Sequence, residues 1–269
     1  MTPASRSPIS SIPTDAGLAA AGSANIKSVM VRDYWPQPQI NTVHINEFYL
    51  NGQPYSVERY VNAGNGTYYL EDFQLTSSGQ IFWWDTWNYE IRADGSVLEI
   101  MDSMVDLNAP QTWSDACRAS ADNCALTDQR LHPMNHGNLL TIGSWFGSQA
   151  SGISYALTIA NGTATIGSAL GQFYNYFSMN PIDVKAYVDL PAGRFNNVLV
   201  QNEQQVVATG ATTSTVNYRF YYAPGSGIIA QQWYGSDWKP LVGSDGRPLG
   251  LIYLQKSCDA PATQYRCSQ

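Results

Sequence analysis

The sequence predicts an all-β protein built on one large antiparallel sheet, either a half-barrel or a sandwich, with a long disulfide-pinned loop. From Ile26 onward, short runs of alternating apolar and polar residues are separated by turn signals, and no run has helical periodicity. This pattern is typical of strands. Three dipeptides that are strong hairpin signals each lie between two such runs: Asn51-Gly52, Asp94-Gly95 and Asn161-Gly162.

These dipeptides predict three hairpins. The first joins residues 42–50 to 55–61, the second joins 81–91 to 97–105, and the third joins 153–159 to 163–166. Consecutive hairpins place neighbouring strands antiparallel, so we expect a single extended sheet.

Residues 107–152 interrupt the strand pattern. The segment is long and weakly periodic, and it contains Cys117, Cys124, His132 and His136. Loops of this length without their own structure are often functional. The alternative is a surface excursion, pinned by a disulfide, that covers a sheet edge.

The four cysteines form two close pairs in the sequence, Cys117 with Cys124 and Cys258 with Cys267, and neither pair has metal-finger spacing. Three pairings are formally possible, but closure of the short loops costs the least entropy. Disulfides would place the protein in a secreted or periplasmic location. Four unpaired buried thiols are the alternative.

Composition favours one exported domain that meets an uncharged partner. Charged residues make up only 13% of the chain and the net charge is −7, with no basic run, so nucleic acid and anionic membranes are not expected partners. No stretch has the roughly 20 apolar residues of a membrane span.

We expect residues 1–25 to be a flexible N-terminal segment and residues 26–269 to form a single β domain. The sequence does not indicate the oligomeric state.

Two turn motifs in the last third of the chain carry a resemblance to a known family. The first is Pro191 with Gly193 before Phe195, and the second is the run Tyr222-Ala223-Pro224-Gly225 followed by Gly227. This pattern resembles exported bacterial proteins of the LolA-like half-barrel type. The resemblance covers about a fifth of the chain and concerns turn geometry. It implies a curved sheet whose concave face holds a lipophilic ligand.

The hairpin around Asp94-Gly95 carries the main candidate for chemistry. If these two residues form the whole turn, Trp87 pairs with Asp102. One face of the hairpin then gathers three carboxylates beside large aromatic rings. Paired carboxylates catalyse glycosidic hydrolysis, and indole rings stack on sugars. The candidate catalytic residues are Asp85, Asp102 and Asp106, and the candidate substrate-binding residues are Trp83, Trp87 and Tyr89.

Two alternatives apply to this hairpin. The aromatic residues are equally consistent with a hydrophobic core, with the aspartates at its rim, and a slip of one residue would exchange the two faces. In the same register Glu90 pairs with Glu99. Like charges in that position are solvated or share a proton.

Other catalytic and cofactor motifs are weak or absent. His132 and His136 are candidate metal ligands only if an aspartate joins them. Since loop histidines are more often surface groups, we expect no metal. His44 lies in a predicted strand and has an expected structural role. No nucleophile elbow, Walker loop or dinucleotide fingerprint is present, so neither a serine hydrolase nor a cofactor is expected.

Three functions remain open from the sequence. The first is a secreted protein that binds or hydrolyses carbohydrate, motivated by 8 Trp, 17 Tyr and the predicted acid cluster. The second is a half-barrel that binds a lipophilic ligand. The third is a non-catalytic interaction protein. The expected partner is a neutral glycan or another small ligand. The sequence leaves open whether the protein is an enzyme; if it is one, glycoside hydrolase is the expected class.

Overall fold

The computed structural model describes residue 18 and residues 22–79, 81–101, 125–132, 134–160, 163–209, 212–244 and 248–268. Within these ranges the named elements are strands and one short 3-10 helix, which confirms the all-β prediction. Among the described residues, no helix has the length and apolar character needed to span a membrane.

The elements follow one another along the chain. They are β1 (Ser28–Met30), η1 (Val31–Tyr34), β2 (Thr42–Leu50), β3 (Gln53–Gly64), β4 (Thr67–Leu75), β5 (Ile81–Ile91), β6 (Val97–Met101), β7 (Ala125–His132), β8 (Met134–Asn135), β9 (Leu139–Thr141), β10 (Phe146–Ala160), β11 (Thr163–Leu190), β12 (Gly193–Thr209), β13 (Thr212–Ala223), β14 (Gly227–Tyr234) and β15 (Ile252–Pro261).

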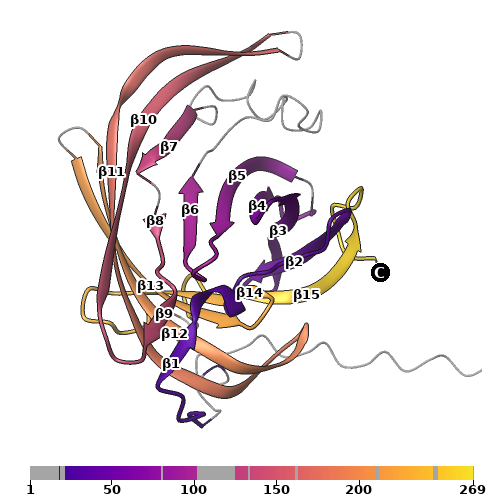
Figure 1. Cartoon of the computed structure of the whole chain (residues 1–269), viewed down its shortest axis with the longest axis vertical. Helices are drawn as coiled ribbons and strands as arrows, with labels where there is room; N and C mark the ends of the chain where they lie inside the picture. Colours follow the sequence, from indigo (N-terminus) through magenta and orange to yellow (C-terminus); the bar gives the residue numbers. More distant parts are fainter. Residues whose placement is uncertain are drawn as a thin grey trace, which may run out of the picture.

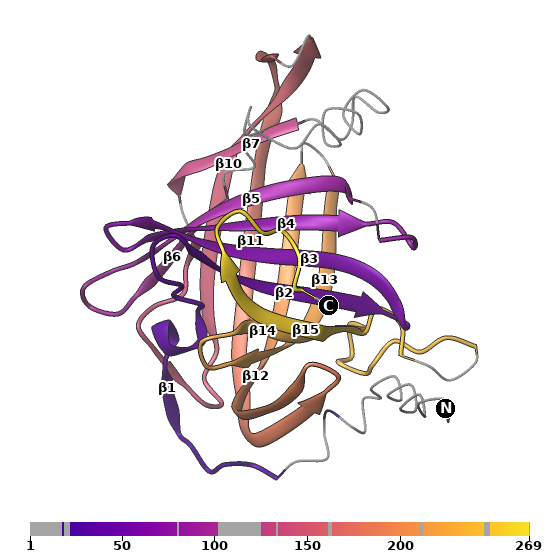
Figure 2. The same cartoon turned by 90° about the vertical axis from the view of Figure 1, so that its right-hand side faces the viewer.

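Thirteen of the fifteen described strands form one curved sheet that nearly closes on itself. Its 13 strands are ordered β7-β10-β11-β12-β13-β14-β15-β2-β3-β4-β5-β6-β8, with every pairing antiparallel. Figure 1 shows the sheet wrapping around a central space, and in Figure 2 strands β2–β5 run across β10–β13. The architecture is therefore the half-barrel alternative, not the sandwich.

The C-terminal strand joins the two halves of the sheet. β15 pairs with β14 at only two positions, Ala230 with Tyr253 and Gln231 with Ile252, but with β2 along nine positions. Strands β2–β6 and β10–β14 are each meanders of sequence neighbours. The last strand of the chain thus connects the two meanders.

The Asn51-Gly52 hairpin is confirmed. Leu50 pairs with Gln53, and both turn residues have positive φ, 52° for Asn51 and 82° for Gly52, as a tight primed turn requires. The third hairpin is confirmed as well, since Ala160 pairs with Thr163.

The Asp94-Gly95 hairpin is present, but its predicted register is wrong by one residue. Ile91 pairs with Val97, so five residues separate the paired ends instead of the two that were expected. The turn is closed by the Arg92 N–H, which donates to the Ser96 carbonyl at 2.9 Å, and by the Gly95 N–H, which donates to the Arg92 carbonyl at 2.9 Å.

This turn changes every pairing in the hairpin. Trp87 pairs with Met101, not with Asp102, and Glu99 lies opposite Tyr89 rather than Glu90. A shift of one residue moves side chains to the other face of a strand. The predicted Glu90–Glu99 pair is therefore wrong, and Glu99 shares a face with Tyr89.

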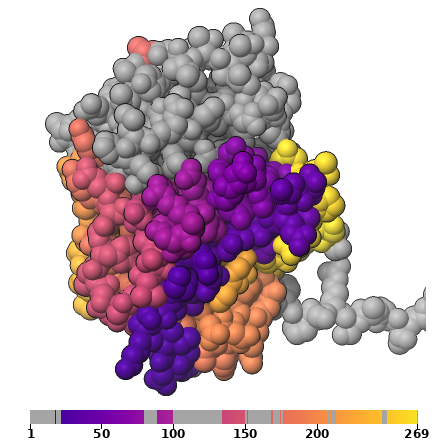
Figure 3. All heavy atoms as spheres, viewed as in Figure 1, coloured from indigo at the N-terminus to yellow at the C-terminus, as the bar shows by residue number. Residues whose placement is uncertain are grey.

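The segment 107–152 is more regular than the loop that was expected. Its described part contains β7, β8, β9 and the start of β10, so the prediction of a long loop is wrong from Ala125 onward. β9 pairs with β1 in a two-stranded sheet, and the two strands are labelled next to each other in Figure 1. In Figure 3 the indigo atoms of the N-terminal part lie against pink atoms from the middle of the chain. Cys117 and Cys124 lie outside the described residues.

Both turns of the family resemblance have the expected form. Leu190 pairs with Gly193, and Ala223 pairs with Gly227 across Pro224 and Gly225. Gly227 has φ 74°, and a Cβ there would lie 2.8 Å from the Tyr60 hydroxyl. Position 227 therefore requires glycine for both its backbone and its packing.

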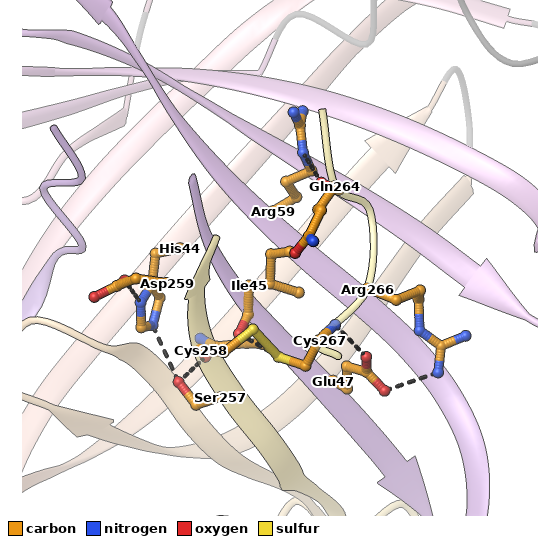
Figure 4. The surroundings of a disulfide bond; sticks show 11 residues. His44, Ile45, Glu47, Arg59, Ser257, Cys258, Asp259, Gln264, Arg266 and Cys267 are labelled. Carbon is orange, nitrogen blue, oxygen red and sulfur yellow. Dashed lines mark hydrogen bonds and ion pairs between the residues drawn. A yellow bond between two sulfur atoms is a disulfide. The ribbon is translucent and has the colours of Figure 1, made fainter. Parts of the chain in front are cut away.

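The Cys258–Cys267 disulfide that the sequence predicts is present and is drawn in Figure 4. It ties the last residues of the chain to β15. A loop of this length stabilises the fold by roughly 2.5 kcal/mol in the chain-entropy model.

Two buried charged side chains fix the C-terminal segment against the sheet. Arg59 on β3 donates to the carbonyls of Gln264 and Ala262 and forms an ion pair with Glu71. Glu47 on β2 accepts hydrogen bonds from Arg266 Nη2 and from the Cys267 N–H, both at 2.8 Å. Burial raises the pKa of Glu47, but Arg266 and the Cys267 N–H outweigh it and lower the pKa overall.

The segment after β1 packs inside the curve of the sheet. Tyr34 donates to the Asn197 carbonyl at 2.8 Å, and Tyr89 donates to the Pro36 carbonyl at 2.6 Å. The ring centroids of Trp35 and Tyr89 are 4.8 Å apart. This segment, with β2–β5, forms one wall of the interior.

Candidate functional site

A cavity of about 320 Å³ lies in the space that the sheet surrounds. Strands from both meanders and the segment after β1 contribute to its walls. Its aromatic lining consists of Tyr34, Trp35, Phe48, Tyr55, Tyr60, Phe177, Tyr218, Phe220, Tyr222 and Trp233. Its acidic lining consists of Glu58, Asp72, Glu99 and Glu203. No lysine or arginine lines it within the described part of the chain.

The alternation of strand residues explains how the acidic groups reach this space. Ser56, Glu58 and Tyr60 are spaced by two along β3, and all three line the cavity. Glu58 pairs with Asp72 on β4, and Asp72 also lines it. Residues that pair directly across strands share a face, so one row of the sheet presents two carboxyl groups.

Glu58 is enclosed among protein atoms at the cavity wall. The Tyr60 hydroxyl donates to Glu58 Oε2 at 2.6 Å. Burial raises the pKa of Glu58 to about 7; the Tyr60 hydrogen bond lowers it, and the charge of Glu99 adds to the rise. Glu58 is therefore a carboxyl group that exchanges its proton near neutral pH.

Glu203 on β12 is the second carboxyl group of this kind. Its exposed fraction is 7%. Burial raises its pKa to about 8, with a further rise from the charge of Glu99 and a smaller opposing effect from a hydrogen bond with Gln201. At neutral pH Glu203 is mostly protonated, and it can donate a hydrogen bond into the cavity.

Glu99 and His136 form a buried pair at the far end of the sheet. His136 Nε2 lies 2.8 Å from Glu99 Oε2. The rings of His136 and Trp35 lie in a T-shaped arrangement, with centroids 5.2 Å apart. Since Glu99 acts on both Glu58 and Glu203, the three glutamates form one electrostatic group.

The tyrosines of the interior act as neutral donors. Burial raises the pKa of Tyr60 well above its ordinary value, and the neighbouring Glu58 adds to this rise. Burial likewise raises the pKa of Tyr222, with Glu203, Glu99 and Glu58 adding to it. The cavity thus combines flat apolar rings, phenolic hydroxyls and carboxyl groups.

The structure places only part of the site that the sequence predicted. Tyr89 is fully buried and stacks on Tyr68 with centroids 5.1 Å apart. Trp83, Asp85 and Trp87 lie on β5, but their side chains are outside the described part of the structure. Asp102 and Asp106 also lie outside the described residues.

The backbone register nevertheless bears on the predicted cluster. Asp85 pairs with Asp72 of β4, which is a cavity residue, whereas the predicted pairing of Trp87 with Asp102 is wrong. The roles proposed for Asp85, Asp102 and Asp106 stay predictions.

The two candidate metal-ligating histidines lie on different segments of the chain. His132 ends β7, and its side chain is outside the described part. His136 is buried against Glu99. Among the described residues, no group of three or more His, Cys, Asp or Glu side chains is arranged to hold a metal ion.

Sequence reasoning did not single out Glu58, Asp72 or Glu203. A signal was present: each is an acid at a strand position whose neighbours two residues away point into the interior. These positions identify the acids as interior residues only when the inner face of each strand is known.

Comparisons with known proteins assign this chain to no family. No protein-family model matches the sequence, and no curated protein is significantly similar to it. One similar solved structure is that of a Bacteroides fragilis protein described as exported, with a YmcC-like fold. Its sequence is 15% identical to this chain, the alignment covers 83% of this chain and 98% of that one, and the TM-score is 0.48. Another is a Parabacteroides distasonis protein described as a lipoprotein, at 14% identity, 84% and 98% coverage and a TM-score of 0.39. Both scores are too low to assign this chain to a family.

Proposed function

We propose that this protein binds a small neutral ligand in the cavity enclosed by its curved sheet. The observation that carries the proposal is the cavity itself, whose volume of about 320 Å³ falls in the range of small-molecule sites. Such sites combine mostly apolar and aromatic walls with a few polar groups that fix orientation, and this lining has that character.

The lining favours a ligand with an apolar face and several hydroxyl groups. Aromatic rings from several strands can stack on the C–H face of a sugar ring. Glu58 and Glu203, with pKa values of about 7 and 8, can each donate or accept a hydrogen bond near neutral pH. An anionic ligand is disfavoured because four carboxyl groups and no described cation line the cavity. A carbohydrate unit fits these demands better than a fatty acid.

We also propose an extracytoplasmic location. The Cys258–Cys267 disulfide supports it, because stable disulfides persist in oxidising compartments.

Binding is tested by thermal unfolding and calorimetry with neutral mono- and disaccharides beside fatty acids and phospholipids. At about 100 times its Kd, a ligand raises stability by about 2.7 kcal/mol, so we expect the unfolding midpoint to rise by roughly 5 °C or more with a saccharide. Trp233→Ala should weaken this binding about tenfold, because Trp233 lines the cavity.

Trp145→Ala is the matched control. Trp145 has an exposed fraction of 53%, near the 42% of Trp233, but it does not line the cavity. Binding should be unchanged in this variant. Binding of lipids alone would instead support the LolA-like function, and no binding by any compound would remove the proposal.

Hydrolysis of a glycosidic bond is the second candidate. Glycosidases use one carboxylic acid of raised pKa and one ionised carboxylate. Glu58 has the raised pKa, and Glu99 beside His136 interacts with it. We expect reducing ends to be released from a soluble polysaccharide, and Glu58→Gln to lower the rate about 100-fold or more. Loss of the rate in Asp85→Asn alone would favour the aspartate site, and no release from any glycan would leave binding as the function.

A further inference from the structure

A serine, a histidine and an aspartate meet between β2 and β15, in an arrangement that no sequence motif announced. Ser257 Oγ lies 3.3 Å from His44 Nε2. His44 Nδ1 lies 2.9 Å from Asp259 Oδ1. Figure 4 shows the three side chains in this order. A hydroxyl on one ring nitrogen and a carboxylate on the other is the connectivity by which a histidine activates a serine nucleophile.

The register of β15 brings these side chains together. Asp259 pairs with His44, and Ser257 pairs with the neighbouring Asn46. The register shifts between Leu254 and Lys256. Such a bulge re-aims the side chains that follow it and is frequent beside active sites. Because of this shift, Ser257 and Asp259 lie on the face of the sheet that carries His44.

The carboxylate fixes the tautomer of the histidine. With Asp259 accepting from Nδ1–H, a neutral His44 has its lone pair on Nε2, toward Ser257. The Ser257 hydroxyl has one hydrogen and two acceptors within reach, His44 Nε2 and Asn46 Oδ1, the latter at 2.9 Å. Rotation of the hydroxyl alone transfers its hydrogen bond from Asn46 to His44. The arrangement in which Ser257 donates to His44 therefore needs no backbone movement.

The surroundings define the substrate. Asp259 is exposed, with 80% of its side chain accessible, while the side chain of His44 is 13% accessible and Ser257 is half-buried. A reacting group must therefore approach from the side of the exposed Asp259, and because Ser257 is itself half-buried, a small group reaches its hydroxyl most easily. This favours a short acyl group. The nearby carboxylate disfavours an anionic one.

We propose that Ser257, His44 and Asp259 form an esterase site for uncharged carboxylic esters with short acyl chains. Ser257 Oγ attacks the ester carbonyl while His44 Nε2 takes the hydroxyl proton. The C–O bond to the alcohol then breaks, and His44 returns the proton to the leaving alkoxide. Water, deprotonated by His44, hydrolyses the acyl-serine and regenerates Ser257 with release of the carboxylic acid. Asp259 is a positioning residue that orients His44.

The site is next to the interior cavity but is not part of its lining: His44 pairs with the cavity residue Tyr60, whereas neither Ser257 nor His44 lines the cavity. Binding in the cavity and hydrolysis at Ser257 can therefore be tested, and can fail, separately.

The test uses the full chain with a fluorophosphonate probe and with p-nitrophenyl acetate. We expect the probe to bond covalently to Ser257, as located by peptide mass spectrometry, and the acetate ester to be hydrolysed. Ser257→Ala and His44→Gln should each lower hydrolysis about 100-fold or more. Asp259→Asn should lower kcat with little change in KM, because it alters the orientation of the base and not the binding of the ester.

Ser178→Ala is the matched control, because Ser178 is also a half-buried strand serine. It should keep both labelling and hydrolysis. Labelling at another residue, no labelling of the wild type, or equal hydrolysis by Ser257→Ala would overturn the proposal. If Ser257→Ala fails to fold, the labelled position in the wild-type protein decides the question.

Discussion

Replacing Arg59 with alanine is expected to destabilise the protein by about 3–5 kcal/mol, the range seen when one partner of a buried ion pair is removed. The Arg59 side chain is only 7% accessible and its partner Glu71 is 17% accessible. Its guanidinium also donates to the carbonyls of Ala262 and Gln264 and lies 4.8 Å from the centre of the Tyr265 ring. The variant would leave these acceptors unmatched and release the C-terminal segment. Urea unfolding gives the change in the midpoint.

Arg194→Ala provides the matched control for this prediction. Arg194 also bonds a carboxylate, with two contacts to Asp189 at 2.7 and 2.8 Å, and also lies over a tyrosine ring, 4.1 Å from the centre of Tyr187. The pair is exposed, however, at 57% and 56%. Its loss should leave the urea midpoint nearly unchanged, because solvent screens an exposed ion pair. Equal effects of the two variants would show that the C-terminal contacts do not stabilise the fold.

Stability is expected to fall as the pH rises from about 5 to 9. Burial raises the pKa of Glu58 to about 7 and that of Glu203 to about 8, from an ordinary value of 4.5. Between 4.5 and these values, the folded protein holds protons that the unfolded chain has released. The slope of the unfolding free energy with pH is therefore negative. The stabilisation is present at low pH and is lost as the pH passes through 7 and 8. One pKa unit corresponds to about 1.4 kcal/mol, so the two shifts together are worth several kcal/mol.

Removal of the two titrating groups isolates this effect. Glu58→Gln combined with Glu203→Gln should flatten the dependence of stability on pH between 5 and 9, and the variant should exceed the wild type at pH 9. The control is Glu90→Gln, whose carboxyl lies on β5 near the turn and does not line the cavity. It should keep the wild-type slope. An unchanged slope in the double variant would mean that the interior glutamates are already ionised at pH 5.

Local chemistry made much of the fold predictable. Asn51-Gly52 needs positive φ at two successive residues, and few structures other than a tight hairpin use them in this way. Pro224 and Gly225 act through the same local preferences. These signals depend on neighbouring residues, so they are present in the sequence whatever the rest of the chain does.

Pairings between distant segments were not predictable in this way. β15 pairs with β2 because the two ends of the chain meet in space, and no short-range pattern records that. The register at Asp94-Gly95 failed for a related reason. The Arg92–Ser96 hydrogen bond lengthens the turn to five residues, and one residue of difference moved Glu99 onto the interior face.

The candidate site depends on these pairings. Glu58, Glu99 and Glu203 come from three separate strands, and the pKa values of Glu58 and Glu203 are raised only because the closed curve removes water from around them. The sequence indicated that acids and aromatic residues would meet inside a sheet, but it selected acids on one hairpin. The structure shows a group assembled from across the whole sheet.

The short strand β8 has a consequence for how a molecule reaches the interior. β8 is two residues long and pairs with β6 only at Leu98–Asn135 and Glu99–Met134. On its other side, a hydrogen bond runs from the Asn135 N–H to the Ser148 hydroxyl of β10, at 3.0 Å, and Met134 packs in a small apolar cluster with Phe146. Most neighbouring strands in the described sheet are joined by long backbone ladders, although β14 and β15 share only two positions. Separation of β8 from β10 therefore breaks few hydrogen bonds. Amide hydrogens of β8 should exchange with solvent before those of β11 and β12, and small solutes should enter at the rate of that local opening.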